Sequence, residues 1–194
     1  MLRGGLAGLG CVLGAAVLVV AIPAPHTAQP VAISYRGDQA ALARLAPYPA
    51  VAPAGLPASW TPVSSELTTG GPVNGPVNGT VNGPVNGPAG AGTVTWALGY
   101  ATPDGALASL QETNASAAPF VRRMTNNGTV LLPAQPAPAG PGGRAWTFSA
   151  TPARGQRSMY VVSPAGFTVV VTGSATWADL RLLAASLRPV VARG

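Results

Sequence analysis

The stretch FTVVVTGSATWADLRLLAASL, residues 167–187, holds a strand pattern followed directly by a helix pattern, and this change of period decides the fold class. Phe167 to Thr172 is a short run rich in β-branched residues, which is typical of a strand. Thr176 and Asp179 have the spacing of a capping box, which marks the start of a helix. Apolar residues then recur at helical spacing until Pro189 ends the pattern. They are Trp177, Leu180, Leu183, Ala184 and Leu187.

Other strand patterns lie upstream of this stretch. Val94 to Tyr100 alternates large apolar residues with small ones, and Thr102-Pro103-Asp104-Gly105 is a turn sequence that returns the chain along Ala106 to Glu112. Ala145 to Ala150 and Ser158 to Ser163 are further strand candidates, and Pro164-Ala165-Gly166 joins the second of these to the strand at 167–172.

A helix is expected between these two groups of strands. Ser116 offers an N-cap, Phe120, Val121 and Met124 form its apolar side, and Gly128 ends it. Val63 to Thr68 is a candidate for one earlier strand. The order of elements and the short connections predict an α+β fold: a small antiparallel sheet with helices packed on one face, after one N-terminal transmembrane helix.

The segment GGLAGLGCVLGAAVLVVAI, residues 4–22, is apolar and uncharged. At about 1.5 Å per residue it spans roughly 28 Å, close to the thickness of the bilayer's hydrocarbon core. Prolines follow it at the expected cleavage positions, so an uncleaved anchor is favoured over a removed signal. Arg3 places the N-terminus in the cytoplasm and the rest of the chain outside, which predicts a single-pass plasma-membrane protein.

Small-residue spacing within residues 4–22 makes a weak homodimer through this helix a hypothesis, and the same residues are the predicted contact with membrane lipid. Cys11 lies inside the run rather than at its end, so it is interpreted as a small membrane residue and not as a lipidation site.

Composition divides the chain into a membrane anchor at 1–22, a Pro/Ala-rich stalk at 23–58, an extracytoplasmic domain at 59–188 and a tail at 189–194. A short helix from Asp38 to Leu45 is expected in the stalk. The Val-Asn-Gly-Pro repeat within 70–92 and the Pro/Gly loop at 133–143 interrupt the domain and are expected to be flexible insertions.

The residues that carry chemistry are few. The net charge is +6, but the arginines are scattered, so nucleic-acid binding is not expected. His26 is the one histidine and Cys11 the one cysteine. The chain therefore offers no base for a Ser or Cys nucleophile and no metal-ligand set, and we expect no catalytic residue, no metal and no cofactor.

Asp104 and Glu112 are the carboxylates that a hydrolase would use, although hairpin register is expected to hold them apart. The tryptophans Trp60, Trp96, Trp146 and Trp177 are expected to be core or half-buried packing residues rather than an exposed platform that binds a sugar or lipid. Arg154 and Arg157 are candidate contacts to anionic polymer or lipid head groups.

Several motifs together resemble the domain-of-unknown-function 4245 family of actinobacterial single-pass membrane proteins. They are GLPASW (55–60), LGYATPDGALASLQET (98–113), GGRAWTFS (142–149) and FTVVVTGSAT (167–176). The resemblance implies the topology and fold described above, and it supplies no activity.

Two functions are carried forward. The first is a non-catalytic binding or scaffold module of the cell envelope, with an unknown envelope protein or polymer as its partner. The second is an envelope hydrolase that uses Asp104 or Glu112.

Overall fold

A computed structural model describes residues 31–70, 92–131 and 138–191. The predicted membrane helix at 4–22, Cys11, His26 and most of the Val-Asn-Gly-Pro repeat lie outside these ranges. Within the described residues, none of the helices has the length and apolar character needed to cross a membrane.

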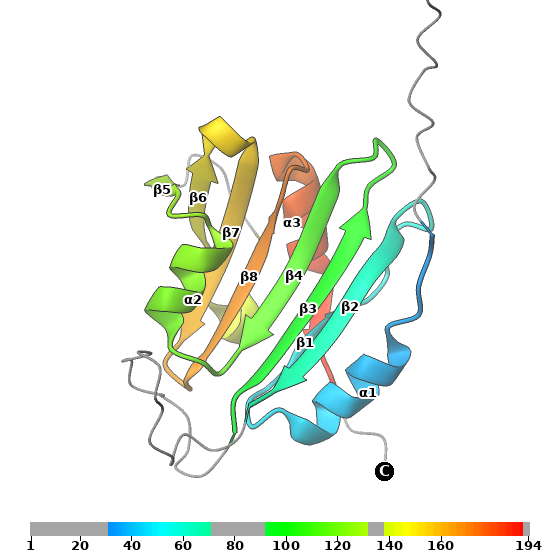
Figure 1. Ribbon diagram of the computed structural model, residues 1–194, viewed down its shortest axis with the longest axis vertical. Coiled ribbons are helices and arrows are strands. Elements are labelled where there is room, and N and C mark those ends of the chain that lie inside the picture. The colour runs from blue at the N-terminus through cyan, green and yellow to red at the C-terminus, as the bar shows by residue number, and fades with distance from the viewer. Residues whose placement is uncertain (1–30, 71–91, 132–137, 192–194) are drawn as a thin grey trace, which may run out of the picture.

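Three helices and nine strands form the described part of the chain, together with 3₁₀ turns at Pro141–Gly143 and Pro152–Arg154 (Figure 1). The helices are α1 (Arg36–Leu45), α2 (Ala117–Met124) and α3 (Trp177–Ser186). The strands are β1 (Val51–Pro53), β2 (Thr61–Thr69), β3 (Val94–Ala101), β4 (Leu107–Thr113), β5 (Thr129–Leu131), β6 (Thr147–Thr151), β7 (Gln156–Ser163), β8 (Phe167–Gly173) and β9 (Leu187–Pro189).

Seven strands form one antiparallel sheet in the order β2-β3-β4-β8-β7-β6-β5. The expected hairpins β3–β4 and β7–β8 are present, and β4 pairs directly with β8, which brings the two hairpins together in the middle of the sheet. The predicted α+β class with an antiparallel sheet is therefore confirmed. β5 was not expected from the sequence, because its three residues are all exposed and show no alternation.

One face of this sheet carries the main core. Cross-strand neighbours such as Leu98, Leu110 and Val171 point to this face and are fully buried. Leu180 and Leu183 of α3 pack against them, and α3 lies behind β8 and β4 in Figure 1. The capping box that begins α3 is formed as expected, because Thr176 Oγ1 accepts from the Asp179 N–H at 3.2 Å.

The helices do not all lie on one face, which corrects the predicted arrangement. α2 packs on β7 and β8 from the side opposite to α3 (Figure 1). Val170 points to that side and is fully buried, and Phe120 of α2 is also buried outside the main core. A strand in the middle of a covered sheet needs apolar residues on both faces, and this is why β8 has a continuous run of valines rather than an alternation.

Residues assigned to a stalk are part of the same folded unit. Leu42 of α1 is 0% exposed and belongs to the main core, to which Tyr48 and Ala50 also contribute. β1 pairs antiparallel with β9 in a second, two-stranded sheet, and the Val190 N–H donates to the Ala50 carbonyl. The packing therefore extends the unit upstream of residue 59 and into the expected tail at 189–194.

Leu187, the last apolar residue predicted for the C-terminal helix, lies outside that helix in the structure. α3 ends at Ser186, and Leu187 begins β9 instead of continuing the helix. Pro189 cannot donate a helical hydrogen bond and disfavours helical backbone at the residue before it, so the chain leaves the helix early and pairs with β1.

Candidate functional site

The two carboxylates considered for acid–base chemistry lie at opposite ends of one hairpin. Asp104 is exposed in the turn between β3 and β4, whereas Glu112 is fully buried near the far end of β4. At about 3.4 Å per residue, the five steps from Leu107 to Glu112 alone cover about 17 Å. Paired carboxylates of glycoside hydrolases lie about 5–10 Å apart. The register therefore keeps Asp104 and Glu112 from acting on one bond.

Glu112 is an acid inside the main core. It points to the α3 side of the sheet between Trp96 of β3 and Val169 of β8, its cross-strand neighbours. Its Oε2 accepts a hydrogen bond from the Val51 N–H at 3.1 Å, while Oε1 has no partner among the described residues. Burial raises the pKa of Glu112 to about 8, and the bond from Val51 opposes this only in part. At neutral pH the side chain is therefore mostly an uncharged carboxylic acid.

Tyr48 is a second buried acidic group near Glu112. Its ring stacks on that of Phe167, with centroids 5.4 Å apart and an interplanar angle of 11°. Its hydroxyl has no hydrogen-bond partner in the described residues. Burial, and after it the charge of Glu112, raises the pKa of Tyr48 far above its ordinary value, so the hydroxyl keeps its proton.

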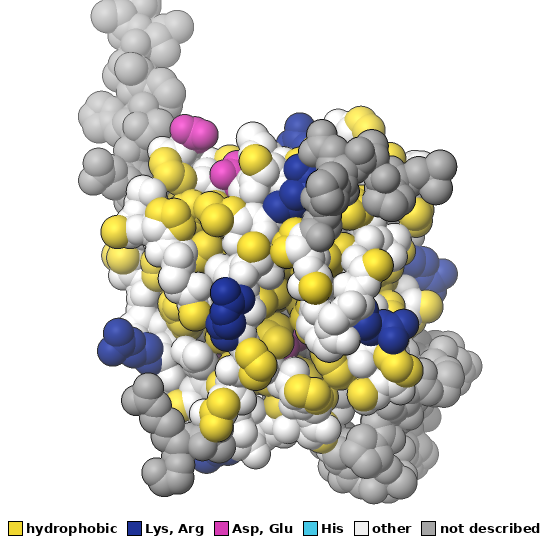
Figure 2. Space-filling view, turned by 180° about the vertical axis from the view of Figure 1, so that it is seen from behind, with side chains coloured by type: hydrophobic (Ala, Val, Ile, Leu, Met, Phe, Trp, Pro, Cys, Tyr) yellow, Lys and Arg dark blue, Asp and Glu magenta, His cyan; other side chains and the backbone are white. Residues whose placement is uncertain are grey.

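An apolar cleft of about 550 Å³ lies directly in front of this pair. Phe167, which stacks on Tyr48, and Val51, which is bonded to Glu112, form part of its wall. The rest of the wall comes from the C-terminal end of α3, from β9 and from the segment 138–142. Seen from the α3 side, the surface shows hydrophobic side chains between separate arginines (Figure 2).

The lining of the cleft is almost free of reactive groups. Among the described residues, Arg188 is its one charged side chain, and the Arg188 guanidinium already donates to the carbonyls of Ala185 and Leu187 at 2.8 Å. Ser163 is its one hydroxyl side chain. Such a surface can exclude water from an apolar ligand and offers no base to activate a nucleophile.

The family described as a protein of unknown function (DUF4245) matches residues 6–187. The chain belongs to the DUF4245 family. This match covers the buried pair, the whole seven-stranded sheet and all of the cleft except Arg188 and Pro189, and it confirms the resemblance that the sequence motifs indicated. No curated protein and no solved structure matches the chain significantly.

The tryptophans of this DUF4245 domain serve packing. Trp60, Trp96 and Trp146 are buried, as expected, and Trp177 is half-buried against Phe148 with ring centroids 5.4 Å apart. Trp96 donates its indole N–H to Ser65 at 3.1 Å, while the Trp146 indole N–H has no partner in the described ranges. The four rings do not form an exposed platform in the DUF4245 domain.

The two arginines singled out in the sequence have different roles in the DUF4245 fold. Arg157 donates to the carbonyls of Ser174 and Ala175, which fixes the connection between β8 and α3. Arg154 is exposed beside a hollow of about 360 Å³ on the α2 side of the sheet. Among the described residues, no three metal-ligating side chains come together.

Sequence reasoning missed two neighbours of Glu112 in this DUF4245 chain: Val51, which donates its N–H to Glu112, and Tyr48, which lies near it. Both lie in a Pro/Ala-rich segment that carries no periodic pattern, so composition assigned them to a stalk. Glu112 lies near the end of β4, where Ala108 and Leu110 share its face. Because alternate residues of a strand point to the same face, this spacing was the available signal that the carboxyl points into the core.

Proposed function

We propose that this chain is a membrane-anchored, extracytoplasmic protein of the cell envelope whose folded domain binds a partner without catalysing a reaction. The anchor is the apolar run at 4–22, with the N-terminus in the cytoplasm because Arg3 precedes it. A plasma-membrane location follows from this orientation. The partner is an envelope protein or polymer that presents an apolar group.

The observation that carries the proposal is the apolar cleft in front of Glu112 and Tyr48. Concave, mostly apolar surfaces with few polar groups are the usual form of ligand sites. Its walls join the first and last strands of the fold to the end of α3, so a bound group would contact three separate parts of the chain. Behind this wall Glu112 is mostly uncharged at neutral pH, and among the described residues no carboxylate lines the cleft itself.

A hydrolase has less support. Asp104 and Glu112 are separated along β4, and Glu112 is fully buried, with the Val51 N–H bonded to its Oε2. Such an enzyme would lose a measurable activity on Asp104→Asn or Glu112→Gln while its fold remained intact.

The binding proposal is tested with a photo-crosslinking residue on α3. Ala185 is exposed and lines the cleft, whereas Ala178 is exposed on the same helix and does not line it. We expect a discrete crosslinked species in living cells from position 185 and none from position 178. Identical patterns from the two positions, or none from either, would refute the cleft as the binding surface.

The topology needs its own measurement. A tag after residue 194 should be cleaved by external protease in intact, wall-stripped cells, because the domain is expected outside the membrane. A protected tag would refute the orientation and the envelope assignment with it.

A further inference from the structure

A second groove, of about 490 Å³, lies between α1 and the C-terminal end of the described chain. Arg36 and Arg44 lie on the α1 side of it, and Val190 and Val191, which follow β9, line it from the other side. The two arginines are eight residues apart on one helix, which places them about 12 Å apart along its axis. We infer that this groove holds the domain against anionic lipid head groups, an inference that rests on the proposed membrane anchor.

Among the described residues, nothing neutralises the charges of the groove. Both Arg36 and Arg44 are exposed, and neither guanidinium group forms an ion pair or hydrogen bond within the described ranges. Asp38, the one acid of α1, is engaged by the hydroxyl of Ser65 on β2. No carboxylate from the described residues lines the groove. Guanidinium groups bind phosphate oxygens with two parallel hydrogen bonds, so a phospholipid head group fits this pair.

Apolar side chains flank the same arginines. Leu45 is 51% exposed at the end of α1, and Val191 is 77% exposed where it lines the groove. Apolar groups next to cationic side chains are typical of surfaces that lie in the membrane interface, because the apolar groups enter the region below the head groups. A soluble anionic polymer would offer no apolar environment in which these exposed side chains could be buried.

The chain's length also keeps this surface close to the bilayer. Eight residues, 23–30, separate the predicted anchor from the described domain, so their extended backbone reaches about 30 Å at most. α1 is the first element after that segment, and it lies beside β2 at one edge of the sheet (Figure 1). Of all the elements, α1 is therefore held nearest to the anchor along the chain.

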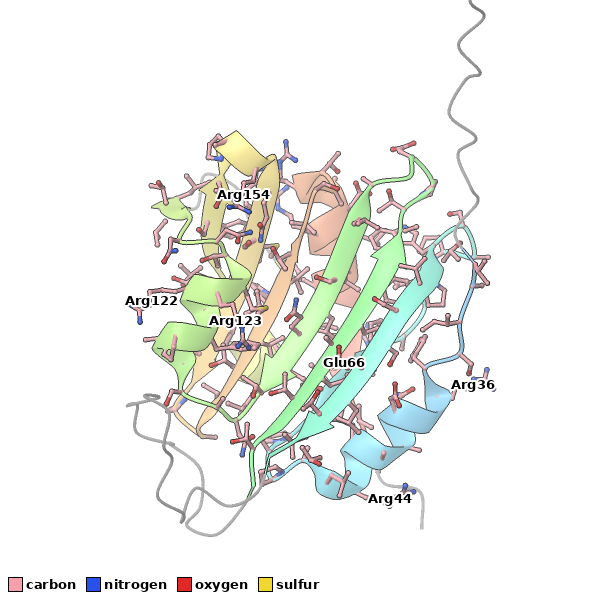
Figure 3. The ribbon with its side chains drawn as sticks, viewed as in Figure 1. Arg36, Arg44, Glu66, Arg122, Arg123 and Arg154 are labelled. Atoms are coloured by element: carbon pink, nitrogen blue, oxygen red, sulfur yellow. The ribbon has the colours of Figure 1, made fainter. Side chains whose placement is uncertain are left out.

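The chain provides a matched control for charge. Arg122 and Arg123 of α2 are also exposed, but they lie far from α1, toward the other edge of the sheet (Figure 3). Removing Arg122 and Arg123 changes the net charge as much as removing Arg36 and Arg44 does. Comparing the two double variants therefore distinguishes an effect of the position of the charges from an effect of net charge.

The test uses the full chain in lipid nanodiscs, with Cys11→Ser and a fluorophore on Ala40→Cys in the groove. Quenching by a head-group-linked quencher reports contact with lipid. We expect strong quenching in discs with phosphatidylglycerol and little in pure phosphatidylcholine. Because each surface arginine contributes about 1 kcal/mol, Arg36→Gln/Arg44→Gln should lower the ratio of docked to undocked domain about 30-fold.

Arg122→Gln/Arg123→Gln should leave this ratio unchanged, and unaltered tryptophan emission confirms that each variant is folded. Equal effects of the two double variants would overturn the inference, since net charge alone would then explain docking. Equal quenching with and without phosphatidylglycerol would overturn the inference as well. So would a change in probe fluorescence that soluble polyphosphate causes and lipid does not. Failure of the chain to insert into discs would instead refute the proposed anchor.

Discussion

Replacing Glu112 with Gln isolates the energetic effect of an acid in the core. The side chain is fully buried and accepts a hydrogen bond from the Val51 N–H, and burial raises its pKa from 4.5 to about 8. Gln has nearly the same shape, keeps a carbonyl oxygen for Val51 and does not ionise. The substitution therefore removes the titration while it preserves the packing.

The sign of the effect follows from the direction of the shift. The folded state holds a proton on Glu112 that the unfolded chain releases, so the free energy of unfolding falls as the pH rises from about 4.5 to about 8. A shift of about 3.5 pKa units corresponds to about 5 kcal/mol over the whole window. Between pH 5.5 and 7.5 the loss is about 2–3 kcal/mol. Tyr48 stays neutral throughout, because its own pKa is raised.

Urea unfolding of residues 31–194, followed by tryptophan fluorescence at several pH values, measures this slope. Glu112→Gln should remove about 2–3 kcal/mol of pH dependence between pH 5.5 and 7.5, and it should be more stable than the wild type at pH 7.5 by about 4 kcal/mol. Glu66→Gln, an exposed position on β2, is the control and should leave the slope unchanged. Identical slopes for the wild type and Glu112→Gln would show that Glu112 is already ionised in the folded state, and the reasoning would be wrong.

Two further outcomes concern the parts that surround the sheet. Leu42→Ala should reduce the free energy of unfolding by about 3 kcal/mol, because it leaves a cavity under α1. Calorimetry of residues 31–194 checks this. A change below about 1 kcal/mol would mean that α1 is not part of the core. Thr176→Ala should lower the free energy of unfolding by about 1 kcal/mol, because it removes the cap of α3, whereas Thr176→Ser should retain the cap. The same method measures both variants. Equal losses of stability would exclude the capping box as the cause.

The sheet was largely predictable because its signals are local. The alternation at 94–100, the turn at 102–105 and the capping box at Thr176 each depend on residues close in sequence, and all three are present. The side of the sheet on which α2 packs was not predictable in this way. It depends on β8 being central, which is set by its pairing with β4 and not by any local pattern.

The candidate site was harder to foresee for the same reason. The cleft joins Val51, Phe167 and Leu187, which come from three distant parts of the chain. The residues from 47 to 53 contain three prolines and short side chains, so their burial comes from tertiary contacts and leaves no period in the sequence. The sequence identified Glu112 as a candidate catalytic carboxylate. Its burial raises its pKa, so the structure assigns it as a mostly uncharged core residue instead.

The pairing of β1 with β9 has a consequence for how the domain assembles. Val51 and Pro189 are about 140 positions apart along the chain, so their contact closes a very long loop. Synthesis must pass residue 189 before β1 can find its partner. Until then Tyr48 and Phe167 lack the strand that borders them, and the growing chain would expose them to chaperones and proteases.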